Sequence, residues 1–218
     1  MKKYIILTVL FIMPISAYLF FATGVNNFSR LPVITEKVNE LPLGESSLGV
    51  QPKLKDKITV VGFLGTDLFK NRGDAFNLNQ KIYNRYKEFD DFQMVFIVPK
   101  GAEEQAELVR KELEPISDLF NWNYLFLDTE DIQGFYDSLG LVGKLDENFA
   151  TPNVYIIDKE LKLRGRKGLN KNGRDEYMEG YNTISAADLH NEMMDDMKVV
   201  LAEYRLALKK YNRINATN

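Results

Sequence analysis

Four short apolar runs, separated by segments of helical periodicity, constrain the fold more than any other feature. They are ITVVGFL (58–64), FQMVFIV (92–98), NYLFLD (123–128) and NVYIID (153–158). A continuous apolar run of this length is typical of a strand buried on both faces of a sheet. Such strands need helices on both sides, so the sequence predicts an α/β domain.

The segments around these runs complete the pattern. The predicted helices are 74–89, 102–119, 131–139 and 186–212. Ser185 followed by Asp188 resembles a capping box at the start of the last helix, whose apolar stripe includes Met193 and Met197. KLRGRK (162–167) predicts an antiparallel hairpin with the fourth strand. The order β-α-β-α-β-α-β-β-α indicates a thioredoxin-like fold, a central mixed sheet flanked by helices.

The N-terminal segment 1–25 has the pattern of a membrane anchor. Lys2 and Lys3 precede an uncharged apolar run of roughly 22 residues, long enough to cross a bilayer as a helix that Pro14 would kink. The positive-inside rule then places a single-pass helix in the cytoplasmic (inner) membrane with the C-terminal domain outside the cytoplasm. The alternative is a cleaved signal peptide and a secreted or periplasmic protein.

Residues 26–57 have scattered Pro, Gly, Ser and charges without a period, which predicts an extended linker before a domain at 58–212.

Composition excludes several classes of function. The chain has no cysteine, so it has no dithiol, thiolate zinc site or iron–sulfur cluster, and it has a single histidine, His190. We therefore expect no metal, no cofactor, no catalytic residues and no thiol–disulfide oxidoreductase activity. A net charge of −3 argues against a nucleic-acid partner. His190 lies beside the stripe of the last helix and is interpreted as a surface or half-buried residue, and Met194 lies off that stripe.

The loop FLGTDLFKN (63–71) carries a closer resemblance. With the anchor, the element order, the VYIID strand and the long last helix, it resembles the Sco/SenC family of membrane-tethered copper chaperones and redox proteins. That family carries F-x-x-x-C-x-x-x-C in this loop and a histidine shortly before the strand equivalent to VYIID. Laying the loop on this pattern puts Asp67 and Asn71 at the cysteine positions, and ENFATPN (147–153) has no histidine. The resemblance therefore implies the fold, whereas the missing cysteines and histidine contradict the family's copper binding.

The candidate binding residues are Asp67, Asn71, Thr151 and Pro152. The fold places the loop after the first buried strand opposite the loop before the fourth, and we expect a cis Thr151–Pro152 bond there. Asp67 is either functional or a helix cap, and Arg72 and Asp74 are interpreted as ordinary loop and first-turn residues. The polar segment 165–182 is interpreted either as a partner-binding loop or as a solvated excursion.

Two functions are compatible with these features. The first is a redox-inactive, membrane-tethered domain that binds a protein partner during assembly or maintenance of envelope complexes. The second is a small-ligand binder, or an enzyme independent of cysteine, that uses the crevice at Asp67 and Thr151–Pro152. The sequence identifies neither the partner or ligand nor the oligomeric state.

Overall fold

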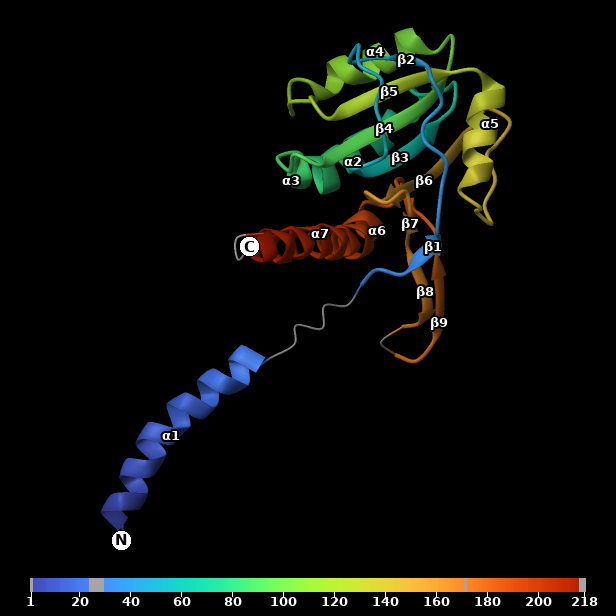
Figure 1. Cartoon of the computed structure of the whole chain (residues 1–218). Helices are drawn as coiled ribbons and strands as arrows, with labels where there is room; N and C mark the ends of the chain where they lie inside the picture. The colour runs from blue at the N-terminus through green and yellow to red at the C-terminus, as the bar shows by residue number, and fades with distance from the viewer. Residues whose placement is uncertain (1, 24–29, 171, 216–218) are drawn as a thin grey trace.

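The computed structural model describes residues 2–23, 30–170 and 172–215 (Figure 1). The strands are β1 (Val33–Thr35), β2 (Glu45–Ser46), β3 (Ile58–Leu64), β4 (Phe92–Pro99), β5 (Trp122–Leu127), β6 (Ala150–Ile157), β7 (Leu163–Arg164), β8 (Arg166–Leu169), β9 (Asp175–Met178) and β10 (Tyr181–Asn182). The helices are α1 (Lys2–Thr23), α2 (Arg72–Leu78), α3 (Asn84–Tyr86), α4 (Glu103–Leu113), α5 (Thr129–Ser138), α6 (Ala186–Asp188) and α7 (Met194–Asn215), with π-helical turns η1 (Asn79–Tyr83) and η2 (Leu189–Met193).

The four apolar runs form the centre of one mixed sheet, in the order β1-β7-β6-β3-β4-β5-β2. Strands β3, β4 and β5 are parallel, and β6 is antiparallel to β3. Strand β7 pairs with β6 as the predicted hairpin, while β8 turns away to pair with β9 in a separate ribbon (Figure 1). The predicted order of elements and the mixed sheet flanked by helices are therefore confirmed.

Two apolar cores lie on the two faces of the sheet. The first contains residues of α2, η1, α4 and the C-terminal helix, with Trp122 packed against Phe96 and Tyr83 at ring-centroid distances of 4.6 and 5.3 Å. The second contains residues of α5 and of the segment before β3. A sheet covered in this way explains why its strands carry continuous apolar runs.

The expectation of a linker is wrong for residues 31–57. This segment pairs β1 with β7 at one edge of the sheet and β2 with β5 at the other, and it buries Val38, Leu41 and Leu54 in the second core. Its apolar residues are isolated between Pro, Gly and charged residues, so no period marks them. The folded domain therefore begins near Leu31 rather than at Ile58.

The C-terminal helix begins as predicted, since Ser185 Oγ accepts the N–H of Asp188 at 3.2 Å. Turn η2 follows α6, and η1 interrupts the predicted helix 74–89 in the same way, so neither prediction of a continuous helix is confirmed in detail. The two π turns contact each other. Met194, predicted to lie off the buried stripe, is buried like Met193 and Met197.

The N-terminal residues Lys2–Thr23 form helix α1, which includes Pro14. Within the part of the chain that the structure describes, no helix meets the combined criteria of length and hydropathy for a membrane span.

A buried ion network joins the two ends of the domain. The Arg164 guanidinium contacts Asp158 Oδ2 and a Glu203 carboxylate oxygen, each at 2.9 Å, and donates to the carbonyl oxygen of Leu31. Glu203 also accepts the N–H of Leu31 at 3.0 Å. Arg164 and Asp158 are only 5% and 1% exposed, so neither charge has an alternative partner in water.

Arg164→Met should destabilise the domain strongly, because it leaves the Asp158 charge buried without its partner. Removing one member of a buried ion pair costs about 3–5 kcal/mol. Chemical denaturation, followed by circular dichroism, measures the loss. Lys198→Met is the matched control, since it removes an exposed pair with Asp195 at 2.7 Å and should cost less than about 1 kcal/mol. Equal, small losses in the two variants would contradict the role assigned to the network.

Candidate functional site

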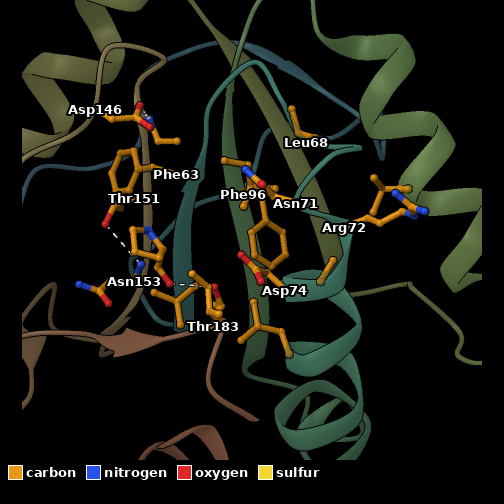
Figure 2. A pocket seen from close by; sticks show the side chains of 18 residues that line it. Phe63, Leu68, Asn71, Arg72, Asp74, Phe96, Asp146, Thr151, Asn153 and Thr183 are labelled. Carbon is orange, nitrogen blue, oxygen red and sulfur yellow. Dashed lines mark hydrogen bonds between the residues drawn. The ribbon is translucent and has the colours of Figure 1, made fainter.

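A crevice of about 250 Å³ opens where β3 ends and β6 begins, beside α2 (Figure 2). Its walls are mostly apolar and include Leu64, Leu68, Leu78 and Phe96. The polar side chains that line it are Asn71, Arg72, Asp74, Asp146, Thr151, Asn153 and Thr183. An apolar crevice with a few polar groups has the composition of a binding site.

Three of the four predicted site residues meet at this crevice. Asn71 lies on one side and Thr151 and Pro152 lie on the other, as the fold requires for the loops at these ends of β3 and β6. Asp67 does not line the crevice, and its side chain is exposed. Its carbonyl oxygen accepts the N–H of Asn71 at 3.3 Å, so the turn positions Asn71 and directs Asp67 to solvent.

The predicted cis bond before Pro152 is wrong, because no cis peptide occurs among the described residues. Pro152 lies inside β6 rather than before it. The β3–β6 register shifts between Gly62 and Leu64, so the residues between Ala150 and Val154 bulge opposite Phe63. A bulge accommodates a residue without an N–H in an otherwise extended strand, and the trans bond continues that strand.

The start of β6 is paired on both sides at the crevice. Leu64 pairs with Ala150 from β3, and β10 pairs with the opposite edge through Asn153 and Val154. The N–H and hydroxyl of Thr183 both donate to the carbonyl oxygen of Pro152, at 2.9 and 2.8 Å. The edge of β6 from Pro152 to Val154 is therefore already occupied by β10 and Thr183.

Asp74 is the site residue that the sequence analysis undervalued. It lies in the first turn of α2, where an acidic residue has an ordinary role as a partner of the helix dipole. In the structure it is half-buried and lines the crevice near Phe96 and Thr183 (Figure 2). Burial raises the pKa of its carboxyl, and the neighbouring Thr183 side chain partly opposes that rise. The sequence signal is an acid in the first turn of the helix that follows β3.

Arg72 lines the same crevice but is engaged elsewhere. Its Nε lies 3.2 Å from a carboxylate oxygen of Glu112 on α4, and its Nη1 donates to the carbonyl oxygen of Phe69 at 2.9 Å. The guanidinium also lies 4.4 Å from the centroid of the Phe69 ring. Figure 2 shows the side chain extending away from Asp74. Its charge is therefore directed to α4.

Asp146 shapes the loop that leads into β6. Its Oδ1 accepts the N–H groups of Asn148 and Ala150, both at 2.8 Å. Phe149 between them has a φ of +59°, a conformation that this turn holds. Sequence reasoning missed Asp146 and Thr183, since nothing local marks either residue as lying near α2.

Neither His190 nor the methionines form part of the crevice. His190 is exposed on η2, as interpreted from the sequence, and Met193 and Met197 are buried in the core. Among the described residues, no group of three or more His, Asp or Glu side chains could hold a metal ion.

Asp74→Asn should stabilise the domain at neutral pH. Because the pKa of this carboxyl is raised in the folded state, ionisation costs the fold stability as pH rises from below the ordinary value of 3.8 through the raised pKa. Asparagine carries no charge to desolvate. We expect the Tm to rise by about 1–2 °C at pH 7, roughly 0.5 kcal/mol in a half-exposed position, and the gain to disappear below about pH 4.

Differential scanning calorimetry between pH 3.5 and 8 measures this effect. Asp67→Asn is the control, because Asp67 is exposed and should leave the Tm unchanged at every pH. A lower Tm for Asp74→Asn at pH 7 would show that the carboxylate is stabilising where it stands.

Comparison with known proteins identifies the fold. No protein-family model and no curated protein matches the sequence. Among solved structures, BsSco, described as a member of the Sco family of cytochrome c oxidase assembly proteins, is 14% identical, with 78% of this chain and 96% of that chain covered at a TM-score of 0.51. The thioredoxin domain of a thiol-disulfide oxidoreductase from Bacteroides vulgatus is 20% identical (81% and 99% covered, TM-score 0.45), and yeast Sco1 is 12% identical (75% and 98%, TM-score 0.45). The chain therefore has a thioredoxin-like fold, similar to that of BsSco, and it carries no cysteine.

Proposed function

We propose that this chain is a redox-inactive thioredoxin-like domain that binds a protein partner through its crevice. One observation carries the proposal: a crevice with polar side chains persists between β3, α2 and β6 in a chain without cysteine. Thiol–disulfide exchange needs an attacking thiolate, which this chain does not contain. Such a crevice can bind a partner without a thiol.

The proposed partner belongs to an assembly process in the cell envelope. The support is an analogy of fold, since BsSco is described as one of the assembly proteins of cytochrome c oxidase. The crevice is small for a free ligand of drug size, for which pockets of about 300–1,000 Å³ are usual. Its size favours a single side chain from a larger partner. A small molecule remains the second candidate, favoured by the same apolar walls.

We also propose that the domain is tethered outside the cytoplasm by its N-terminal segment. The support is the sequence, in which Lys2 and Lys3 precede an uncharged apolar run from Tyr4 to Val25. Such a run is longer than the apolar region of about 7–15 residues in an ordinary signal peptide. The folded domain begins near Leu31, so the tether between the two is short.

Crosslinking from the crevice tests the binding function. Because the natural chain has no cysteine, Asn71→Cys gives a single attachment point for a thiol-linked photo-crosslinker at the crevice. We expect it to capture a defined membrane or envelope protein in cells. The matched control is Glu130→Cys, an exposed position on α5, which should not capture the same protein. Failure to capture any protein reproducibly from Asn71→Cys would overturn the proposal.

Single-cysteine labelling tests the topology. A membrane-impermeant maleimide applied to intact bacterial spheroplasts should label Glu147→Cys, because this exposed residue belongs to the folded domain. Tyr4→Cys, which keeps both lysines, should be labelled only after lysis, since the positive-inside rule keeps this end of the chain in the cytoplasm. Labelling of both variants in intact spheroplasts, or of neither, would contradict the proposed orientation. Recovery of the domain in the soluble fraction with its first residues removed would favour the signal peptide.

A further inference from the structure

We infer that the crevice takes a basic side chain, lysine or arginine, from the partner, with its charge at Asp74. This inference rests on the proposed binding function and names the chemistry of its ligand. It follows from three observations: the charge of the crevice, the form of its walls and the pairing of β6. None of them follows from the loss of cysteine.

The crevice is acidic where a ligand would meet it. Asp74 and Asp146 line it, and Arg72 is the one basic residue in the described lining. Arg72 is paired with Glu112, while no ion pair involves Asp74 among the described residues. Asp146 already accepts two backbone N–H groups through Oδ1. Asp74 is thus a half-buried carboxylate without a cation, and a positive ligand would supply one.

An anionic ligand fits this arrangement poorly. It would meet the carboxylate of Asp74, and the guanidinium that could offset this lies against α4. Like charges at close range disfavour binding. The chemistry of the lining therefore selects for a cation.

The walls suit a side chain with an apolar stem. Leu68, Leu78 and Phe96 contribute apolar surface to the crevice, Phe96 lies beside Asp74 (Figure 2), and the cavity of about 250 Å³ has room for one long side chain. Lysine and arginine pack three or four methylene groups on apolar surface and place the charge at the tip. A compact inorganic cation would leave these walls uncovered.

The pairing of β6 determines how the partner is held. Recognition by strand addition requires an exposed edge with free N–H and C=O groups. Here β3 takes one edge of β6, while β10 and Thr183 take the other. A partner segment therefore cannot extend the sheet along the edge that β10 occupies, and the bulge opposite Phe63 leaves no regular ladder on the other side, which favours insertion of a side chain.

Peptide titration of the full chain in detergent micelles tests the inference. The probes are acetylated, amidated Ala-Ala-X-Ala-Ala peptides with lysine, arginine, norleucine or glutamate at X, followed by NMR chemical shifts of crevice residues. Pentylammonium, pentanol and pentanoate form a parallel series of free small molecules. We expect the cationic member of each series to bind at least about tenfold more tightly than its neutral and anionic counterparts, because only it pairs with Asp74.

Variants locate the interaction. Asp74→Asn should weaken binding of the lysine peptide about tenfold or more, and Asp67→Asn should leave it unchanged. The calorimetric Tm of Asp74→Asn verifies that the variant is folded. Equal binding of the norleucine and lysine peptides, or full binding by Asp74→Asn, would overturn the inference. Stronger binding of pentylammonium than of the lysine peptide would identify a free amine as the ligand in place of a protein side chain.

The outcome is separable from that of the proposed function. If Asn71→Cys captures a partner equally well with Asp74 and with Asp74→Asn, the partner-binding function stands and the cation inference fails. If the lysine peptide binds through Asp74 and no protein is captured, the cation site stands and the partner-binding function fails.

Discussion

The buried charge of Arg164 is the constraint on which the arrangement of this domain depends. A guanidinium this far from water is tolerated only where its donors meet acceptors, and here these come from the β6–β7 turn, from α7 and from the carbonyl of Leu31. Asp158 also accepts the N–H groups of Glu160 and Lys162 through its other oxygen, so the same carboxylate shapes the hairpin turn. One residue thereby fixes where the first described strand, the hairpin and the last helix meet.

This junction also determines what surrounds the crevice. Once α7 is held against β7, the segment that precedes it must return along β6, which places β10 on the strand edge and Thr183 beside Asp74. Asp196, near the start of α7, reinforces that path by accepting hydrogen bonds from Tyr181 and Arg166 at 2.7 Å. The ligand crevice is consequently built from both halves of the chain, and Thr183 is a part of it that the sequence does not mark.

The central fold could be predicted because its signals are local. A strand such as Ile58–Leu64 is marked by its own apolar run, and Ser185 marks the start of the helix that follows it directly. The path of residues 31–57 could not be predicted, because Val38 and Leu54 are buried against a sheet that later residues form. The site residues also fall into those that the sequence predicts and those that it does not. The positions of Asn71 and Thr151 follow from strand ends. Asp67 lies in the loop before α2 and Asp74 in the first turn of α2, and only the direction of the helix decides which of them faces the crevice.

The two π turns show how that direction is set. An α-helix advances about 100° per residue. The direction in which a side chain of its last turn points is therefore fixed by the direction of its first turn and the number of residues between them. Turn η1 adds one residue to the helical repeat between Asp74, which lines the crevice, and Tyr86, which is buried in the core. Turn η2 does the same ahead of Met197 and Val200, and the two turns contact each other. One extra residue in each helix changes the angle between its first and last turns. The two ends of each helix can therefore face different surroundings.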